Sequence, residues 1–411
     1  MAADPRQSTS RGRKARRQIK RVVFFSLRIP EMSGGSVAIV NLSHALRDRG
    51  YEVEHISQYP PTWRPEFPTT TLIDREELHT GPTLRAGGRK TPTKIATGAA
   101  KLLIKKIDRR LITRRLLAEA RTWDTSTAVV FTHAWTRRSL ASTGYRRPAD
   151  GPLFIGQHHT QAEVLDNDPQ LCENLDKYFC HGGVDVITAL TSADAEVLEG
   201  FLGVPCVGIP NPLSTDDRRQ STLTSHRAVT LARFSAEKQL DLMIRAFSKA
   251  TEAMDGEARW TLDIYGEGET HSQLEDTIHH CGSADRVSIH QPTTTPLRVY
   301  ESAELNLLSS SFEGFGMTIV EAGSCGVPSI VFDCSTGVRR AVGEGGLLVS
   351  PTTELAFAEA LKSLINDEPR IRSLGRAARA NAEAFTPDAI ASRWEEVLSP
   401  THDWRDYPSH R

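Results

Sequence analysis

Short apolar runs alternate with amphipathic segments along most of this chain, and this order restricts the possible folds more than any other feature. In residues 19–57 an apolar run is followed by a glycine loop at 33–36, helical spacing at 36–50 and a second predicted strand, YEVEHIS, at 51–57. A strand, loop, helix and strand in this order form a parallel pair joined by a right-handed crossover. Repetition of the unit predicts an α/β fold with doubly wound parallel sheets.

The length predicts two such units, because 411 residues correspond to two or three domains of about 150 residues. A polar run at 214–227 separates the first series of strands and helices from a second series that starts at 228–234. We therefore predict two Rossmann-like domains that face each other across a cleft. The predicted boundaries are a disordered basic arm at 1–20, an acceptor domain at 21–212, a nucleotide-sugar donor domain at 213–395 and a tail at 396–411.

Composition and charge exclude several classes of protein. The chain has 50 basic and 51 acidic side chains, which argues against a protein that coats nucleic acid. Its six cysteines form no C-x-x-C pair, so we expect reduced thiols and no zinc ribbon. The apolar run at 22–27 is too short for a signal sequence or a membrane span, which predicts a cytoplasmic location.

Positive charge is concentrated locally in two segments. Residues 1–21 contain eight Lys or Arg and a single acid, Asp4, and residues 94–121 contain nine Lys or Arg against Asp108 and Glu119. The second segment has helical spacing through Ile107 and Leu111. A basic amphipathic helix can lie on an anionic membrane surface or face a polyanionic acceptor. A solvated outer helix is the third interpretation, and the sequence leaves all three open.

Two glutamates, Glu313 and Glu321, lie in the segment that carries most information about chemistry. Gly314 and Gly316 disfavour a continuous helix through this region, so we place Glu313 in a loop and Glu321 in the following helix. One carboxylate can then bind sugar hydroxyls while the other reaches a ribose. The glycine backbone and the new helix N-terminus can meet a diphosphate between them.

This segment resembles the E-x7-E motif of the large retaining glycosyltransferase family numbered four, which has the GT-B fold. Other segments resemble further elements of the family in the same order: EMSGGSVAIVNLSHALRDRGYEV near the start, then IPNPLS, LARFSAEKQLDLMIRAF, DIYGEG, GVPSIVFDC and GEGGLLVSP. The resemblance extends from about residue 20 to residue 397. It implies a metal-independent transferase that retains the anomeric configuration and uses a nucleoside diphosphate sugar as substrate, with no further cofactor.

The resemblance also implies roles for individual residues. Glu313 would orient and electrostatically support the donor sugar, while Arg233 and Lys238 would stabilise the departing diphosphate. Without the resemblance, each of these cations would be interpreted as a surface charge. The remaining donor-site residues would be Gly34, Gly35, Gly314, Phe315, Gly316, Met317, Thr318 and Glu321.

A histidine after a strand of the first domain is also expected beside the donor sugar and acceptor. His159 in GQHHT matches the family's position best, and His133 in FTHAW is its nearest competitor. Three other patterns are interpreted as non-functional. Asp166-Asn167-Asp168 spells a metal motif by chance, Cys325 is a packing residue, and Ser324 lacks the G-x-S-x-G spacing of a nucleophile.

The string FDCSTG resembles family members that decorate cell-surface polysaccharides or teichoic-acid-like polymers. It favours transfer of a hexose or N-acetylhexosamine from a UDP-sugar to a cell-envelope glycan, a polyol-phosphate polymer or a lipid-linked acceptor. Gln291, where many members have glycine, marks a difference near the base pocket. Two alternatives are a sugar-nucleotide epimerase of the same fold and a non-catalytic scaffold that binds a glycan or membrane.

Overall fold

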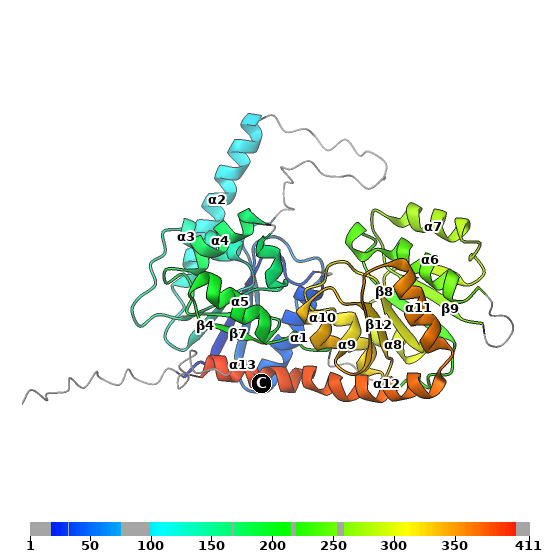
Figure 1. Cartoon of the computed structure of the whole chain (residues 1–411). Helices are drawn as coiled ribbons and strands as arrows, with labels where there is room; N and C mark the ends of the chain where they lie inside the picture. The colour runs from blue at the N-terminus through cyan, green and yellow to red at the C-terminus, as the bar shows by residue number, and fades with distance from the viewer. Residues whose placement is uncertain are drawn as a thin grey trace, which may run out of the picture.

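Two parallel sheets, each covered by helices, make up the protein (Figure 1). The computed structural model describes residues 18–31, 33–74, 98–166, 168–214, 219–252 and 259–399, without the side chains of 98–105 and 166. The two parallel sheets with their covering helices confirm the predicted doubly wound architecture. The predicted arm up to residue 17 and the tail from residue 400 lie outside the described residues.

The first sheet has seven parallel strands in the order β3-β2-β1-β4-β5-β6-β7. Its strands are β1 (Arg21–Ser26), β2 (Glu52–Ser57), β3 (Thr69–Thr71), β4 (Thr127–Phe131), β5 (Leu153–Gln157), β6 (Val186–Ala189) and β7 (Cys206–Gly208). Its helices are α1 (Gly34–Asp48), α2 (Gly98–Ala120), α3 (Ala134–Ser142), α4 (Pro169–Phe179) and α5 (Ser192–Leu202).

Both faces of this sheet are buried, which explains the continuous apolar run in β1. Val22 and Phe24 point to one face and pack with α1, whereas Val23 and Phe25 point to the other face and pack with α2 to α5. Successive side chains of a strand alternate between faces, so only a strand covered on both sides is apolar at every position.

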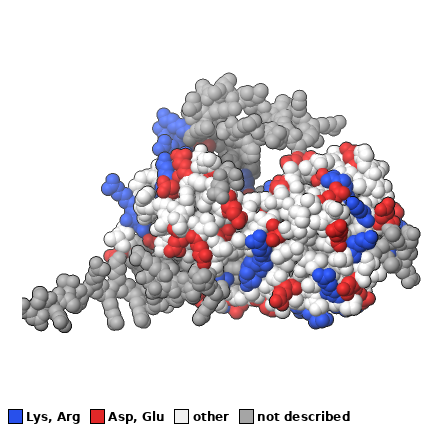
Figure 2. Space-filling view, viewed as in Figure 1, with Lys and Arg blue, Asp and Glu red and all other residues white. Residues whose placement is uncertain are grey.

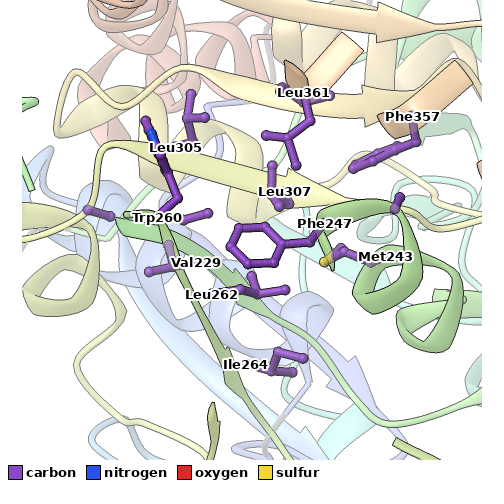
Figure 3. Packing of buried hydrophobic residues seen from close by; sticks show 14 of the residues in the cluster. Val229, Met243, Phe247, Trp260, Leu262, Ile264, Leu305, Leu307, Phe357 and Leu361 are labelled. Atoms are coloured by element: carbon purple, nitrogen blue, oxygen red, sulfur yellow. The ribbon is translucent and has the colours of Figure 1, made fainter. Parts of the chain in front are cut away.

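The second sheet has six parallel strands in the order β10-β9-β8-β11-β12-β13. Its strands are β8 (Arg227–Leu231), β9 (Thr261–Tyr265), β10 (Val287–His290), β11 (Leu305–Leu308), β12 (Ser329–Phe332) and β13 (Gly346–Val349). The helices of this half are α6 (Leu240–Ala250), α7 (His271–His280), α8 (Pro296–Glu301), α9 (Met317–Ser324), α10 (Thr336–Val342), α11 (Glu354–Ile365) and α12 (Glu368–Ala382). Figure 3 shows Phe247 of α6 between the strand residues Leu262 and Leu307 in the core of this domain.

The last helix, α13 (Pro387–Leu398), returns to the first domain (Figure 1). Trp394 is 2% exposed and packs edge-on against Phe24 of the first sheet. Arg49 at the end of α1 binds Asp388 at 2.6 Å and also contacts Glu395. Although we placed the end of the second domain at 395, packing groups residues 387–398 with the first domain.

Several local details differ from the sequence-based expectations. The segment at 60–92 is rich in Pro, Thr and Gly, which predicts irregular structure, but β3 lies within it. The sequence patterns did not indicate α7 or β13. Their sequences explain this, since α7 buries only Leu274 and Ile278, and β13 is partly exposed. The helical spacing at 36–50 placed Val37 near the buried face, but Val37 is 39% exposed and α1 buries Ala38 and Ile39.

The predicted basic helix is present as α2. Its second half is anchored by Leu116, which is fully buried, whereas Ile107 is 41% exposed. Within the residues that the structure describes, no helix is both long enough and apolar enough to cross a bilayer.

Candidate active site

The centre of the candidate site is an ion pair between Lys238 and Glu313. Lys238 Nζ donates to Glu313 Oε1 at 2.6 Å, and Ser310 Oγ donates to the same oxygen at 2.9 Å. The Lys238 and Glu313 side chains are only 16% and 15% exposed. An ammonium and a hydroxyl therefore meet at one carboxylate oxygen that has little access to water.

Two loops hold these groups in register. Ser309 Oγ donates to the carbonyl of Lys238 at 2.8 Å, and the Ser311 amide donates to the carbonyl of Glu237 at 2.8 Å. Lys238 closes a short 3-10 turn (Ala236–Lys238), and Gln239 then adopts φ 47° before α6 starts. The loop after β11 therefore fixes the position of Lys238.

Helix α9 begins at Met317, four residues after Glu313. Gly316 caps this helix with φ 80°, a conformation that side chains disfavour. No side chain of the described residues caps it, so the backbone amides of Met317 and Thr318 can bind an anion. Phe315 is only 3% exposed and packs against Phe385, so its side chain is structural.

Glu321 lies one turn further along α9 and is confirmed as a helical residue. It keeps partial access to solvent, but burial raises the pKa of its carboxyl to about 7. The fully buried Tyr300 lies close to it, and its pKa is raised first by burial and then by the charge of Glu321. Among the described residues no hydrogen bond or ion pair reaches this carboxylate, which can therefore accept a bond from a ligand hydroxyl.

Arg233 follows β8 by two residues and points into solvent. Its side chain is 78% exposed and pairs with Glu237 at 3.2 Å. The structure therefore brings Lys238 to Glu313 but leaves Arg233 paired elsewhere. An exposed i,i+4 pair of this kind contributes little to stability, so the guanidinium can exchange partners at small cost.

The first domain meets this site through a close backbone approach at Gly314. A Cβ at Gly314 would lie 2.7 Å from the His159 carbonyl oxygen, so a side chain there requires the two domains to shift. On the same side Thr336 Oγ1 donates to Asp194 at 3.3 Å. Leu190 of the first domain packs with Phe315. The loop that contains Gly314 and Gly316 is thus part of the junction between the two domains.

The histidines of the first domain occupy different environments. Both ring nitrogens of His159 are covered, and burial, followed by the nearby His133 and His158, lowers its pKa to about 3. His158 is buried and bonds Thr160 Oγ1 at 2.9 Å, and burial lowers its pKa to about 4. His133 precedes α3 and keeps solvent access, although the protein around it lowers its pKa. His133 is therefore the ring more open to a substrate.

The glycines near the start of the chain lie in a helix. Gly34 and Gly35 form the first turn of α1, and Ser33 caps it through its side-chain oxygen, which accepts from the Ser36 amide. Added Cβ atoms at both glycines would meet nothing within 4 Å. The space beside both glycines is thus open at the carboxyl edge of the first sheet, where ligands bind in such folds.

The patterns that we interpreted as non-functional lie at the ends of helices. Asp168 caps α4 by accepting from the Leu171 amide, whereas Asn167 lies outside the described residues. Ser324 and Cys325 are buried at the end of α9. Among the described residues no three His, Cys, Asp or Glu side chains gather as a metal site would require.

Sequence reasoning missed two members of the site, Ser310 and Cys334. Cys334 follows β12, and its thiol pKa rises to about 11 through burial and then through the charge of Glu313. The thiol is therefore protonated beside the carboxylate. The serine run before Glu313 was visible in the sequence, but only the fold shows that Ser310 turns back to it.

Comparison with known proteins identifies the second half of the chain. Residues 215–381 match the family described as glycosyl transferases group 1. This segment is a group 1 glycosyl transferase domain. It contains Arg233, Lys238, Glu313 and Glu321, so the resemblance noted in the sequence is confirmed for the part of the chain that carries these residues.

Two relatives match longer stretches of this chain. The chain is 33% identical over 231 residues to the exopolysaccharide phosphotransferase SCO2592 of Streptomyces coelicolor, a match that covers 55% of this chain but only 24% of that protein. It is 22% identical over 387 residues to an uncharacterized glycosyltransferase of Haemophilus influenzae, covering 92% of this chain and all of the relative.

Solved structures confirm the GT-B fold. The crystal structure of S. aureus TarM with fondaparinux, α-GlcNAc-glycerol and UDP superposes with a TM-score of 0.71, covering 92% of this chain and 100% of TarM. Sequence identity is 14%, so this similarity concerns the fold alone.

Proposed function

We propose that this protein is a retaining glycosyltransferase that moves a hexose or N-acetylhexosamine from a nucleoside diphosphate sugar, with UDP as the expected nucleotide, to a hydroxyl of a cell-envelope glycan or a related polymer. The observation that carries the proposal is the Lys238–Glu313 pair beside the N-terminus of α9, at the junction with the first domain. The cation and the backbone amides can bind the diphosphate of a nucleotide sugar, and the carboxylate can bind hydroxyls of its sugar.

The charges of the donor would be distributed over these groups. The diphosphate would take the Met317 and Thr318 amides and the Lys238 ammonium, and Arg233 would leave Glu237 to join them. Two cations neutralise the leaving diphosphate where charge develops, so the proposed reaction needs no metal for that step. Glu321, which has no competing partner among the described residues, would accept a ribose hydroxyl.

Glu313 would hold the donor sugar when Lys238 turns to the phosphate. We propose transfer on the same face of the sugar, with the leaving phosphate oxygen taking the proton of the acceptor hydroxyl. The bond from the anomeric carbon to the phosphate breaks as the bond to the acceptor oxygen forms. Glu313 then acts by orientation and charge, not as a nucleophile.

The names of related proteins support the polymer acceptor. One relative is named for exopolysaccharide, and TarM was crystallised with UDP and α-GlcNAc-glycerol. The expected location, in the cytoplasm with contact to the inner face of the plasma membrane, stays a prediction.

Incubation with labelled UDP-glucose or UDP-N-acetylglucosamine, with and without extracted cell-envelope polymer, tests the proposal. We expect label in the polymer only when both are present. Isomerised nucleotide sugar without acceptor would indicate the epimerase alternative. Binding of the sugar nucleotide with no turnover under either condition would favour the non-catalytic scaffold.

A further inference from the structure

Two tryptophans of the first domain are exposed, although the other three described tryptophans are buried. Trp63 is 37% and Trp135 41% exposed, whereas Trp123, Trp260 and Trp394 are at most 5% exposed. Leaving such large apolar rings in water is unfavourable for a protein that has nothing to place against them. Their position in the fold therefore needs a reason.

Both rings belong to the carboxyl edge of the first sheet. Trp63 follows Thr62, whose amide donates to the carbonyl of Pro30 just beyond β1. Trp135 is the second residue of α3, the helix that follows β4, and Ser139 in the same helix donates to Gln58 just beyond β2 at 2.7 Å. Since β1, β2 and β4 are parallel neighbours, these segments share one edge, the edge where Gly34 and Gly35 also lie.

Each tryptophan is accompanied by an exposed arginine. Arg64 is the next residue after Trp63, and the Arg138 guanidinium carbon lies 4.8 Å from the ring centroid of Trp135. Neither arginine forms an ion pair with a carboxylate of the described residues. We call these four residues, Trp63, Arg64, Trp135 and Arg138, the Trp–Arg surface.

Helix α2 adds positive charge on the same side. Arg115 binds Asp74 at 2.6 Å just after β3, and Glu119 accepts from Thr70 within β3 at 2.7 Å, so the helix runs from the carboxyl edge toward the opposite edge. Its residues before Arg115 therefore extend past the carboxyl edge, by roughly 1.5 Å per residue. Figure 2 shows Lys and Arg gathered over this helix, where Lys106, Arg109, Arg110 and Arg114 are exposed.

From these observations we infer that the Trp–Arg surface binds an anionic glycan, a chain in which sugar rings carry or alternate with carboxylate or phosphate groups. Indole faces stack on the apolar faces of pyranose rings, and guanidinium groups bind carboxylate and phosphate in a bidentate manner. A neutral glycan would not need the arginines, and a bare polyanion would not need the tryptophans. The inference rests on the proposed function in one respect, because it makes this glycan the acceptor.

Calorimetry on the full chain with three probes tests the inference. The probes are hexagalacturonate, neutral maltohexaose and inorganic polyphosphate, each measured at low and high salt. Hexagalacturonate should bind most tightly and weaken as salt rises. Equal or tighter binding of either other probe would overturn the inference, as would binding only to vesicles of anionic lipid.

Variants separate stacking from charge. Trp63→Ala/Trp135→Ala should weaken hexagalacturonate about tenfold and leave polyphosphate binding unchanged. Arg64→Gln/Arg138→Gln should weaken both anions and reduce the salt dependence. The matched controls are Phe201→Ala, at a 50% exposed aromatic on α5, and Arg121→Gln, just beyond the far end of α2; both should stay within about twofold of the parent. Unfolding temperatures confirm that each variant folds.

The same samples distinguish this inference from the proposed function. The protein could bind hexagalacturonate, lose this binding in the tryptophan variant, and bind no nucleotide sugar. That result would overturn the transferase proposal but support the inference about the Trp–Arg surface. If the protein binds a nucleotide sugar but both double variants keep the hexagalacturonate affinity of the parent, the inference about the Trp–Arg surface is overturned and the transferase proposal stands.

Discussion

Lys238 Nζ lies 2.6 Å from Glu313 Oε1 although 75 residues separate them, and neither side chain has much access to water. Removing one member leaves the other charge largely buried without its partner. Lys238→Met or Glu313→Gln alone should therefore lower the free energy of unfolding by about 1–3 kcal/mol in urea titrations. The double variant should recover most of that loss.

Transfer activity should respond differently from stability. Because both groups are proposed to act on the donor, each single variant should lose about 100-fold or more in turnover, and the double variant should not recover it. Turnover near that of the parent in Glu313→Gln, with the fold retained, would remove this carboxylate from the site.

Arg233 can be tested without disturbing the fold. Its side chain is 78% exposed, so Arg233→Ala should change the free energy of unfolding by less than about 0.5 kcal/mol. Affinity for the nucleoside diphosphate, measured by calorimetry, should fall about tenfold because a charged contact to phosphate is lost. Arg298→Ala is the control, since Arg298 is 54% exposed and also pairs with a nearby glutamate in the same domain. Equal affinities of the two variants would contradict the assignment.

The raised pKa of Glu321 predicts an unusual pH dependence of the protein's stability. Its pKa is about 7 in the folded protein, against 4.5 ordinarily, so the unfolded chain loses this proton first as the pH rises. The stability associated with the protonated carboxyl is therefore complete below about pH 4.5 and lost as the pH rises through 7. Glu321→Gln should stabilise the protein by about 1–2 kcal/mol at pH 8 and have no effect at pH 4.

Two measurements complete this test. Chemical denaturation of parent and variant across pH 4–8 gives the stability difference, and calorimetry at pH 8 should show weaker nucleotide sugar binding by Glu321→Gln. A stability difference that is the same at every pH would show that the carboxyl titrates normally.

His133 and His159 should separate into a substrate-facing and a structural residue. His159→Ala removes a ring whose nitrogens are covered and should cost about 2–4 kcal/mol of stability, while His133→Ala should cost less than about 1 kcal/mol. We expect the larger loss of transfer rate per folded molecule in His133→Ala. The reverse order of rates would restore the sequence-based preference for His159.

The sequence was sufficient for the architecture because both sheets have strong local signals. The apolar run of β1 and the glycine stop of α1 each follow from local patterns. Elements with weak sequence patterns were not predicted. α7 has only two buried side chains and β3 is three residues long, so neither leaves a periodic signature.

The site was predictable in its residues but less so in its geometry. Gly314 and Gly316 indicated a loop at Glu313 and a helix at Glu321, as the structure has them. The contacts of Glu313 were not accessible, because Lys238 is 75 residues away and the sequence does not show that the Ser310 side chain turns toward this carboxylate. The return of α13 was hidden for the same reason, because Arg49 and Asp388 are 339 residues apart.

A thermal-shift comparison with UDP-, GDP-, ADP- and dTDP-sugars, on the parent and Lys238→Met, tests the central claim most directly. A ligand at 100 times its Kd stabilises the native state by about 2.7 kcal/mol, enough to raise the unfolding temperature measurably. We predict that one nucleotide, expected to be UDP, raises the unfolding temperature of the parent and that the rise is absent in the variant. No shift with any nucleotide sugar, or the same shift in both proteins, would contradict a donor site at Lys238 and Glu313.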